Sequence, residues 1–270
     1  MPNIGRKKQR IAGRIPAKRS LGQNFLVDDS IVDRIVNSFC PTASDIVVEI
    51  GPGHGALTEK LVGRVEKLYT LEFDSSLAPL LRRRFSDRDD LVVIEDDALT
   101  FDFGLLATPG RRLRVIANLP YNISTAILQR LFDSSEILED CVLMFQREVA
   151  ERITAAPGIK DRGYLTIMTE LHFDVEHLFD VPPSAFRPAP KIWSSVVRIV
   201  PKPAELKNKE AFRKLLSAGF AQKRKTIANN LKALFADVTG LLIQARIDPT
   251  RRAETLTLEE WLRLNDVVHK

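Results

Sequence analysis

The sequence predicts an α/β fold: a mostly parallel sheet with helices on both faces and an antiparallel edge, followed by a small all-α C-terminal domain. Short apolar runs alternate with helical periods between residues 45 and 145, a pattern typical of parallel sheets. Two later apolar runs have no full helix between them, which indicates an antiparallel pair at the sheet edge. From residue 208 onward only helical periods occur.

Apolar spacing marks each expected element of the sheet. A helix is expected at Ile31–Val36, because the spacing is helical there and Pro41 follows. Five nearly all-apolar runs have the composition of central parallel strands; they are Asp45–Ile50, Leu68–Phe73, Leu91–Ile94, Leu113–Ala117 and Cys141–Phe145. The helices expected between and after these strands are Ala56–Leu61, Ser75–Phe85, Ile123–Phe132, Arg147–Ala155 and Tyr164–His172.

The rest of the chain divides at residues 201–203, where two prolines flank a lysine and predict a linker. The expected edge strands before it are Val175–Val181 and Trp193–Val200, joined by a proline-rich stretch. The helices expected after it are Glu210–Phe220, Lys225–Phe235, Leu241–Ile247 and Leu258–Val267. We therefore expect a flexible basic arm at residues 1–20, a sheet domain at 21–200 and a helical domain at 205–270.

Composition narrows the class of protein. The chain has 270 residues, and none of its apolar runs approaches the ~20 residues that span a bilayer. Its two cysteines lie far apart, which argues against structural zinc and a disulfide framework and suits the reducing cytoplasm. The four histidines form no ligand cluster, so no metal is expected. The N-terminus lacks the apolar segment of a secretory signal, although a basic start also suits organellar targeting.

Charge is distributed unevenly along the chain. Residues 1–27 contain seven Lys or Arg and no acidic residue, and residues 205–270 contain 13 basic and 8 acidic residues. Between them, residues 28–204 carry 27 acidic and 20 basic residues. Basic flanks around an acidic central part are typical of a protein whose flanks bind a polyanion while the central part has a different role. A solvated tail and an ordinary helical surface would give the same pattern.

The strongest candidate for a ligand-binding loop is Gly51-x-Gly53-x-Gly55, between a strand and a helix. Glycines let the backbone approach a ligand closely, and the helix N-terminus adds partial positive charge. Glu72 ends the next strand, about 20 residues on, where a carboxylate can bind both hydroxyls of a ribose. Asp97 follows the third strand and can accept from an adenine amino group. These features predict S-adenosylmethionine, whereas NAD would require GxGxxG.

The run Asn118-Leu119-Pro120-Tyr121 follows the fourth strand, beside the expected methyl donor. An adenine amino group is a poor nucleophile, because its lone pair is delocalised into the ring. The Asn118 side-chain oxygen and a backbone carbonyl near Leu119 or Pro120 could accept its two hydrogens and localise that lone pair. Tyr121 could stack on the extruded base. No strong base is needed before transfer. The alternative is a plain turn between strand and helix.

Four motifs together resemble the ribosomal RNA adenine dimethyltransferases, in particular those that act on small-subunit rRNA. They are Gly22-Gln23-Asn24-Phe25-Leu26, Val48-Glu49-Ile50-Gly51-Pro52-Gly53, Asn118-Leu119-Pro120-Tyr121-Asn122-Ile123-Ser124-Thr125 and Pro182-Pro183-Ser184-Ala185-Phe186-x-Pro188-x-Pro190-Lys191. The resemblance extends from Leu21 through Gln222-Lys223-Arg224-Lys225-Thr226-Ile227 in the helical domain. It implies a Rossmann-like class I methyltransferase sheet and an enzyme of the cytoplasm that acts as a monomer.

The resemblance also assigns site residues. The implied contacts to S-adenosylmethionine are Asn24, Leu26, Gly51, Glu72, Asp97 and Asn118. Gly53, in the glycine loop, is a further expected contact. Tyr121 and Phe186 are implied to sandwich the target adenine, so the expected catalytic set is Asn118, Leu119, Pro120, Tyr121 and Phe186. The implied substrate is 16S rRNA in an immature 30S particle, where two adjacent adenosines near the 3′ end are each methylated twice. Lys223, Arg224 and Lys225 are expected to contact RNA phosphates.

Several alternatives stay open from the sequence. Phe25 could be core rather than a lid on the cofactor, and Phe186 could be turn packing. Ala126 stands where the family often has proline, and Trp193 where it often has aspartate, which affects substrate detail more than activity. An antibiotic-resistance enzyme acting on large-subunit rRNA would share the chemistry. A ribosome-assembly or transcription factor could keep the fold without catalysis, but a damaged cofactor loop or a lost Asn118 would be its mark, and neither is seen.

Overall fold

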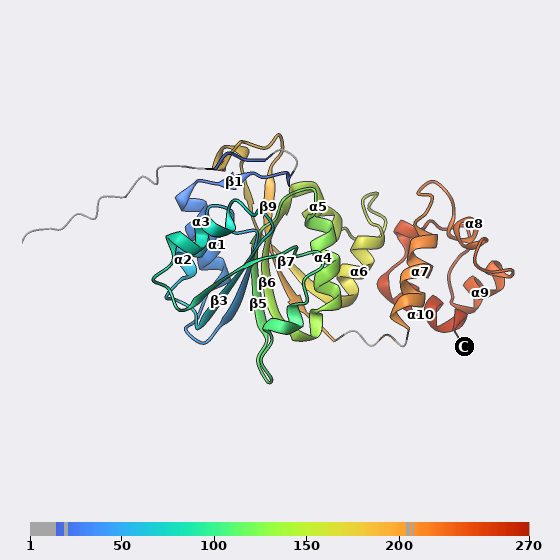
Figure 1. Ribbon diagram of the computed structural model, residues 1–270. Helices are drawn as coiled ribbons and strands as arrows, with labels where there is room; N and C mark the ends of the chain where they lie inside the picture. The colour runs from blue at the N-terminus through green and yellow to red at the C-terminus, as the bar shows by residue number, and fades with distance from the viewer. Residues whose placement is uncertain (1–14, 19–20, 204–205, 207, 270) are drawn as a thin grey trace, which may run out of the picture.

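The computed structural model describes residues 15–18, 21–203, 206 and 208–269. Its centre is a seven-stranded sheet with the order β4-β3-β2-β5-β6-β9-β7. Helices α1 to α3 cover one face and α4 to α6 the other, while α7 to α10 extend beyond α6 (Figure 1). Most of the predicted basic arm lies outside the described residues. Within the described part of the chain, no helix is both long enough and apolar enough to cross a membrane.

The strands are β1 (Phe25–Leu26), β2 (Ile46–Ile50), β3 (Lys67–Glu72), β4 (Leu91–Glu95), β5 (Leu113–Asn118), β6 (Leu138–Gln146), β7 (Phe173–Val181), β8 (Phe186–Arg187) and β9 (Ser194–Pro201). The helices are α1 (Asp29–Phe39), α2 (Thr58–Leu61), α3 (Ala78–Arg84), α4 (Ser124–Asp133), α5 (Arg147–Ile153), α6 (Tyr164–His172), α7 (Lys209–Gly219), α8 (Ile227–Leu231), α9 (Val238–Gln244) and α10 (Leu258–Val268).

The predicted α/β fold is confirmed, including its antiparallel edge. Strands β2 to β6 pair in parallel, whereas β9 pairs antiparallel with both β6 and β7. All five residues of β2 are buried, as expected for a central strand that helices cover on both faces. Because β2 pairs with β3 on one side and β5 on the other, the chain reverses its strand order there. Ligands of open α/β sheets bind at the carboxyl ends of strands at such a point.

Apolar side chains pack on both faces of the sheet. One buried cluster joins α1 and α2 to the sheet through residues such as Phe39 and Leu61. The second joins α4 to α6 to the other face and continues into the C-terminal helices, where it includes Phe212 and Trp261. The sheet and the C-terminal helices therefore share one continuous apolar core. The division into domains at residues 21–200 and 205–270 stays a prediction.

Polar contacts also fix the C-terminal helices against the sheet part. Arg162, 1% exposed, donates to the carbonyl oxygens of Ala155 and Leu256 and forms an ion pair with Glu170. All these partners satisfy a guanidinium that would be costly to bury alone. One residue thus joins the loop before α6 to the segment before α10.

Several element boundaries differ from the prediction by two or three residues, and three of the differences have a local cause. The helix predicted at Lys225–Phe235 is the shorter α8; it begins at Ile227 because the Thr226 side chain accepts from the Asn229 amide and caps it, and it ends at Leu231. Helix α9 begins at Val238 rather than Leu241, capped by Asp237. Strands β1 and β8 pair antiparallel although neither was predicted, since two residues are too few to show a period.

Candidate active site

The glycine loop after β2 forms one wall of a cavity of about 210 Å³ at the carboxyl end of the sheet. Gly51, Gly53 and Gly55 have φ angles of 67°, 58° and 80°, in the left-handed region that favours glycine. A Cβ on Gly53 would lie 2.9 Å from the Phe25 ring. The loop therefore needs glycine both for its conformation and for its close approach to the segment above it.

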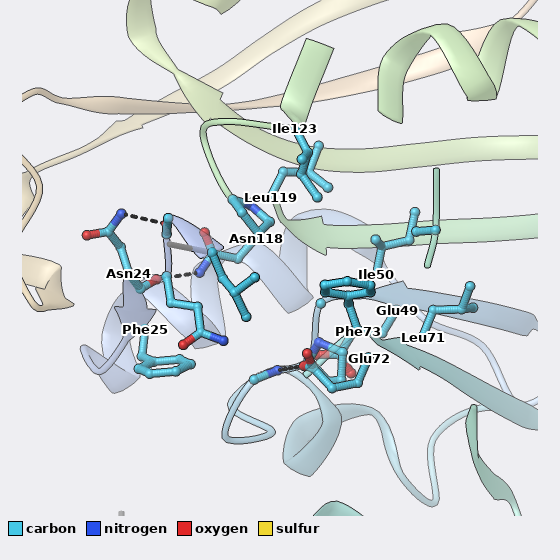
Figure 2. Close-up of a pocket in the computed structure, with 18 of the residues that line it drawn as sticks. Asn24, Phe25, Glu49, Ile50, Leu71, Glu72, Phe73, Asn118, Leu119 and Ile123 are labelled. Carbon is cyan, nitrogen blue, oxygen red and sulfur yellow. Dashed lines mark hydrogen bonds between the residues drawn. The ribbon is translucent and has the colours of Figure 1, made fainter. Parts of the chain in front are cut away.

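Glu72 lies at the end of β3, beside this loop, and is 5% exposed. Its carboxylate accepts from the backbone amide of Gly53 at 3.0 Å (Figure 2). It also accepts from the backbone amide of Asp74 at 2.9 Å. Burial raises the pKa of Glu72, although these two amides oppose the rise. Each oxygen has used one acceptor site, so each can accept one further hydrogen bond, as two ribose hydroxyls would require.

Glu49, near the end of β2, is 1% exposed and lines the same cavity. Burial raises its pKa to about 7, while the hydroxyl of Thr58, which donates at 2.6 Å, opposes the rise. A buried carboxyl group with a pKa near neutrality can exist in either charge state at physiological pH. Its ionised form would favour a positively charged ligand in the cavity.

Asp97 and Phe73 border the cavity beyond Glu72. Asp97 is half-buried, and its side chain accepts from the Leu99 amide at 2.9 Å, which orients the carboxylate. Phe73 is 60% exposed, unusual for a phenylalanine, and its ring is placed for stacking on a flat ligand (Figure 2). Phe73 was not selected from the sequence. In the sequence it extends the apolar run of the strand, so only its exposure in the structure distinguishes it from a core residue.

Asn118 ends β5 on the opposite side of the loop, and a segment far away in sequence holds its side chain. The Asn118 Nδ2 donates to the Asn24 carbonyl oxygen at 3.2 Å (Figure 2). That bond orients the amide and leaves its oxygen as the acceptor available to a ligand. The Pro120 carbonyl accepts from the Ile123 amide in the following turn. The Leu119 carbonyl is therefore the better candidate for the second acceptor.

Tyr121 completes this side of the cavity, and its hydroxyl forms a 2.6 Å hydrogen bond with the hydroxyl of Ser194. Burial raises the pKa of Tyr121, so the phenol is neutral at physiological pH. Ser194 is fully buried at the start of β9 and was not selected from the sequence. Since 73 residues separate the two hydroxyls, no local pattern could indicate their contact.

The segment from Leu21 to Leu26 forms the wall of the cavity above the glycine loop. Phe25 is half-buried, and its ring centroid lies 4.3 Å from that of His54, which supports the lid interpretation over a core residue. Below this wall, Asp74 accepts from Gln23 at 3.0 Å and pairs with Lys18 at 2.6 Å. These contacts fasten the segment to the loop after β3.

The cavity brings together most of the residues that the sequence suggested; they are Asn24, Leu26, Gly51, Gly53, Glu72, Asp97, Asn118, Leu119, Pro120 and Tyr121. Its donor set fits S-adenosylmethionine, because a glycine cradle, two carboxylates and an exposed aromatic ring suit a nucleoside that carries positive charge. Lys223, Arg224 and Lys225 do not line it; they are exposed in the turn before α8.

Phe186 is not presented to the cavity. Its side chain is fully buried in the apolar cluster on the α1 face, and its backbone pairs with Leu26 through β1 and β8. The prediction of an exposed stacking ring at Phe186 is therefore wrong for this conformation. The proline-rich setting that suggested a presented aromatic instead supports a strand pair, which turns the ring into the core.

Comparisons with known proteins point to one family. The family model described as "Ribosomal RNA adenine dimethylase" matches residues 15–270. The "Ribosomal RNA small subunit methyltransferase A" of Saccharophagus degradans is 44% identical over 255 residues, covering 93% of this chain and 94% of that protein. The protein of the same name from Hahella chejuensis is 42% identical, covering 98% of this chain and 97% of that one.

Solved structures give the same result. A dimethyladenosine transferase from Plasmodium falciparum superposes with a TM-score of 0.74 at 28% identity, covering 89% of this chain and 95% of that one. The 23S rRNA methyltransferase ErmE superposes with a TM-score of 0.68 at 26% identity, covering 92% of this chain and all of that one.

Proposed function

Because the chain belongs to the ribosomal RNA adenine dimethylase family, we propose that it methylates the N6 atoms of two adjacent adenosines near the 3′ end of 16S rRNA, twice each, during assembly of the small ribosomal subunit. The observation that carries this proposal is the oriented Asn118 amide at the end of β5, with Tyr121 beside it in one cavity. The antibiotic-resistance alternative, on large-subunit rRNA, is less well supported. The two relatives named for the small subunit are 44% and 42% identical to this chain, whereas the 23S enzyme is 26% identical.

S-adenosylmethionine would supply the methyl group from a positively charged sulfur. Glu72 would accept from the two ribose hydroxyls, and Asp97 from the adenine amino group, with Phe73 against the ring. The backbone at Gly51 and Gly53 would approach the rest of the molecule closely. Asn24, Leu26 and Phe25 would cover it from the opposite wall. Deep burial of Glu49 and Glu72 would place two carboxylates near the positive charge.

At the other end of the cavity, Asn118 and Leu119 would prepare the nucleophile. The Asn118 side-chain oxygen and the Leu119 carbonyl would each accept one hydrogen of the adenine amino group. The nitrogen would then become pyramidal, with its lone pair directed at the methyl group. The nitrogen–carbon bond would form as the sulfur–carbon bond breaks, and the methylated nitrogen, now acidic, would release a proton to water. Tyr121 would hold the extruded base by stacking, worth roughly 1–3 kcal/mol. Positioning and exclusion of water would supply most of the rate enhancement.

The RNA contacts outside the cavity belong to the same proposal. Lys223, Arg224 and Lys225 are exposed in the turn before α8, and 13 basic residues against 8 acidic ones give the C-terminal part a positive charge. The N-terminal basic residues would add sequence-independent affinity. We propose that the substrate is an immature 30S particle, that the enzyme acts as a monomer, and that it works in the cytoplasm, where its two free thiols would stay reduced.

Mass mapping of RNA methylated by the purified protein tests the proposal. We would incubate the protein and S-adenosylmethionine with small-subunit particles, with free 16S rRNA and with 23S rRNA, then digest the RNA and locate the modified nucleotides. N6,N6-dimethyladenosine at two adjacent positions of 16S rRNA is the expected result. Dimethylation only of 23S rRNA would favour the resistance enzyme, and methylation of neither RNA would favour a non-catalytic assembly factor.

A further inference from the structure

Trp193 is an exposed aromatic residue next to the candidate active site, and the proposed reaction does not use it. Its side chain is 48% exposed, and the neighbouring Ile192 is 39% exposed. Trp261, the second tryptophan of the chain, is completely buried. An aromatic face left in water is available to stack on a flat group such as a nucleic-acid base.

The backbone places Trp193 close to the base-binding side of the cavity. Trp193 directly precedes Ser194, whose hydroxyl lies 2.6 Å from the Tyr121 hydroxyl. Successive Cα atoms are only about 3.8 Å apart, so Trp193 begins one residue away from the contact that orients Tyr121. The Trp193 carbonyl also accepts from the Arg147 amide at 3.0 Å, which ties it to the start of α5. The ring is therefore carried on a fixed backbone.

Two basic residues precede Trp193 on the same segment. Arg187 and Lys191 are both exposed, and Arg187 donates to the backbone carbonyl oxygens of Ser184 and Phe186. Arg147 is 53% exposed beside it, although it pairs with Glu151 and Asp180. An exposed aromatic face that shares a segment with exposed basic residues suits single-stranded nucleic acid, whose bases stack and whose phosphates attract positive charge.

We propose that Trp193 is a stacking platform for the nucleotide that neighbours the adenine in the active site, with Arg187 and Lys191 near its phosphates. This inference rests on the proposed function, because it requires an RNA substrate. Extruding a base leaves its neighbours partly unstacked. Trp193 directly precedes Ser194, the hydrogen-bond partner of Tyr121, so its ring would offer a second stacking face to such a neighbour. Stacking there would determine which adenine of a pair enters the cavity.

Fluorescence tests the stacking directly. In Trp261→Phe protein, Trp193 is the single tryptophan fluorophore, and RNA stacking should quench it. The probe is an RNA hairpin whose loop contains two adjacent adenines, compared with the same hairpin carrying an abasic site next to them. We expect saturable quenching by the first RNA and little by the second. Equal or absent quenching with both RNAs, under conditions where anisotropy shows binding, would overturn the proposal.

Steady-state methylation supplies an independent readout. Trp193→Ala should raise KM for the hairpin about tenfold, the scale expected when one base stack is removed, while Trp193→Phe should recover most of the loss. The matched control Ile192→Ala should change KM less than about twofold. With the abasic hairpin, wild type and Trp193→Ala should have the same KM. An unchanged KM in Trp193→Ala on the intact hairpin would contradict the inference.

The two proposals fail in different ways. If the wild-type protein methylates neither 16S rRNA nor the hairpin, the proposed function fails. If the wild-type protein methylates RNA and Trp193→Ala does so with the same KM and the same distribution between the two adenines, only the inference about Trp193 fails. Melting temperature and S-adenosylmethionine affinity should be unchanged in Trp193→Ala, because its side chain is exposed and lies outside the cavity lining.

Discussion

The backbone carbonyl of Asn24 accepts a 3.2 Å hydrogen bond from the side-chain amide of Asn118. The contact joins two parts of the chain that are 94 residues apart. It also fixes which end of the Asn118 amide faces the cavity, since the nitrogen is engaged and the oxygen is free to accept. The wall that covers the cofactor cavity therefore also sets the orientation of the proposed catalytic group.

Asn118→Ala should lower kcat for methylation by roughly 10²–10³-fold, the usual effect of removing one preorganised hydrogen-bonding group. S-adenosylmethionine binding should stay measurable by calorimetry, because most of the proposed contacts to it remain. Gln129→Ala, an exposed amide on α4, is the control and should be fully active. Full methylation by Asn118→Ala would exclude the role we assign to the amide.

Glu72→Gln should weaken S-adenosylmethionine binding by roughly 10–100-fold, because a charged acceptor of two ribose hydroxyls is replaced by a neutral one. Glu95 ends the neighbouring strand in register with Glu72 but is exposed and pairs with Arg82. Glu95→Gln is therefore a matched control, and its affinity should equal that of wild type. Calorimetry that finds Glu72→Gln unchanged would rule out the ribose contact.

Glu49→Gln should stabilise the protein at alkaline pH. The folded-state pKa of about 7 lies above the ordinary value of 4.5, so the stability that protonated Glu49 contributes is fully present below pH 4.5. It is lost as pH rises through 7. The ionised carboxylate then costs about 3 kcal/mol, which glutamine avoids.

Melting curves at several pH values check this prediction. Glu49→Gln should melt several degrees above wild type at pH 8, and the difference should shrink toward zero near pH 5. A difference that is constant across this range would show that the titration of Glu49 does not contribute.

Asp74→Asn should loosen the wall above the glycine loop. Burial alone would raise the pKa of Asp74, but hydrogen bonds from Lys18, Ser76 and Gln23 hold it well below its usual range. Asparagine keeps the shape and removes the charge that these donors stabilise. We expect faster amide hydrogen exchange at residues 21–26 and severalfold weaker S-adenosylmethionine binding. Unaltered exchange in this segment would mean that the Lys18 pair does not secure it.

Deleting residues 1–14 should reduce RNA affinity without affecting cofactor binding, since Lys18 and its partner Asp74 remain. The deleted stretch carries five basic residues. For each RNA phosphate that these residues neutralise, the deletion should lower the slope of log K against log salt by about 0.7–0.9. Binding titrations at several salt concentrations measure this slope. A slope equal to that of the full chain would assign these residues no part in RNA binding.

The sequence predicted the sheet well, because strands such as β2 and β5 are mostly apolar runs, followed by glycine after β2 and ended by asparagine in β5. It also located the cavity, since parallel strands place Gly51, Glu72 and Asn118 at one edge. It failed where contacts are distant or elements short. Neither the Tyr121–Ser194 hydrogen bond nor the strand pair that buries Phe186 leaves a periodic signal. Phe73 was missed because only its exposure distinguishes it from a core residue.

The pairing of β1 with β8 connects the wall of the cofactor cavity to the segment that leads to Trp193. Strand β1 belongs to the wall over the cofactor cavity, and β8 begins the segment that leads to Trp193. Because the two strands pair, a ligand that restricted the motion of one would also restrict the other, and the first ligand would then meet part of the entropic cost of binding the second. By thermodynamic reciprocity, RNA should then raise the affinity for the methyl donor by the same factor as the donor raises the affinity for RNA.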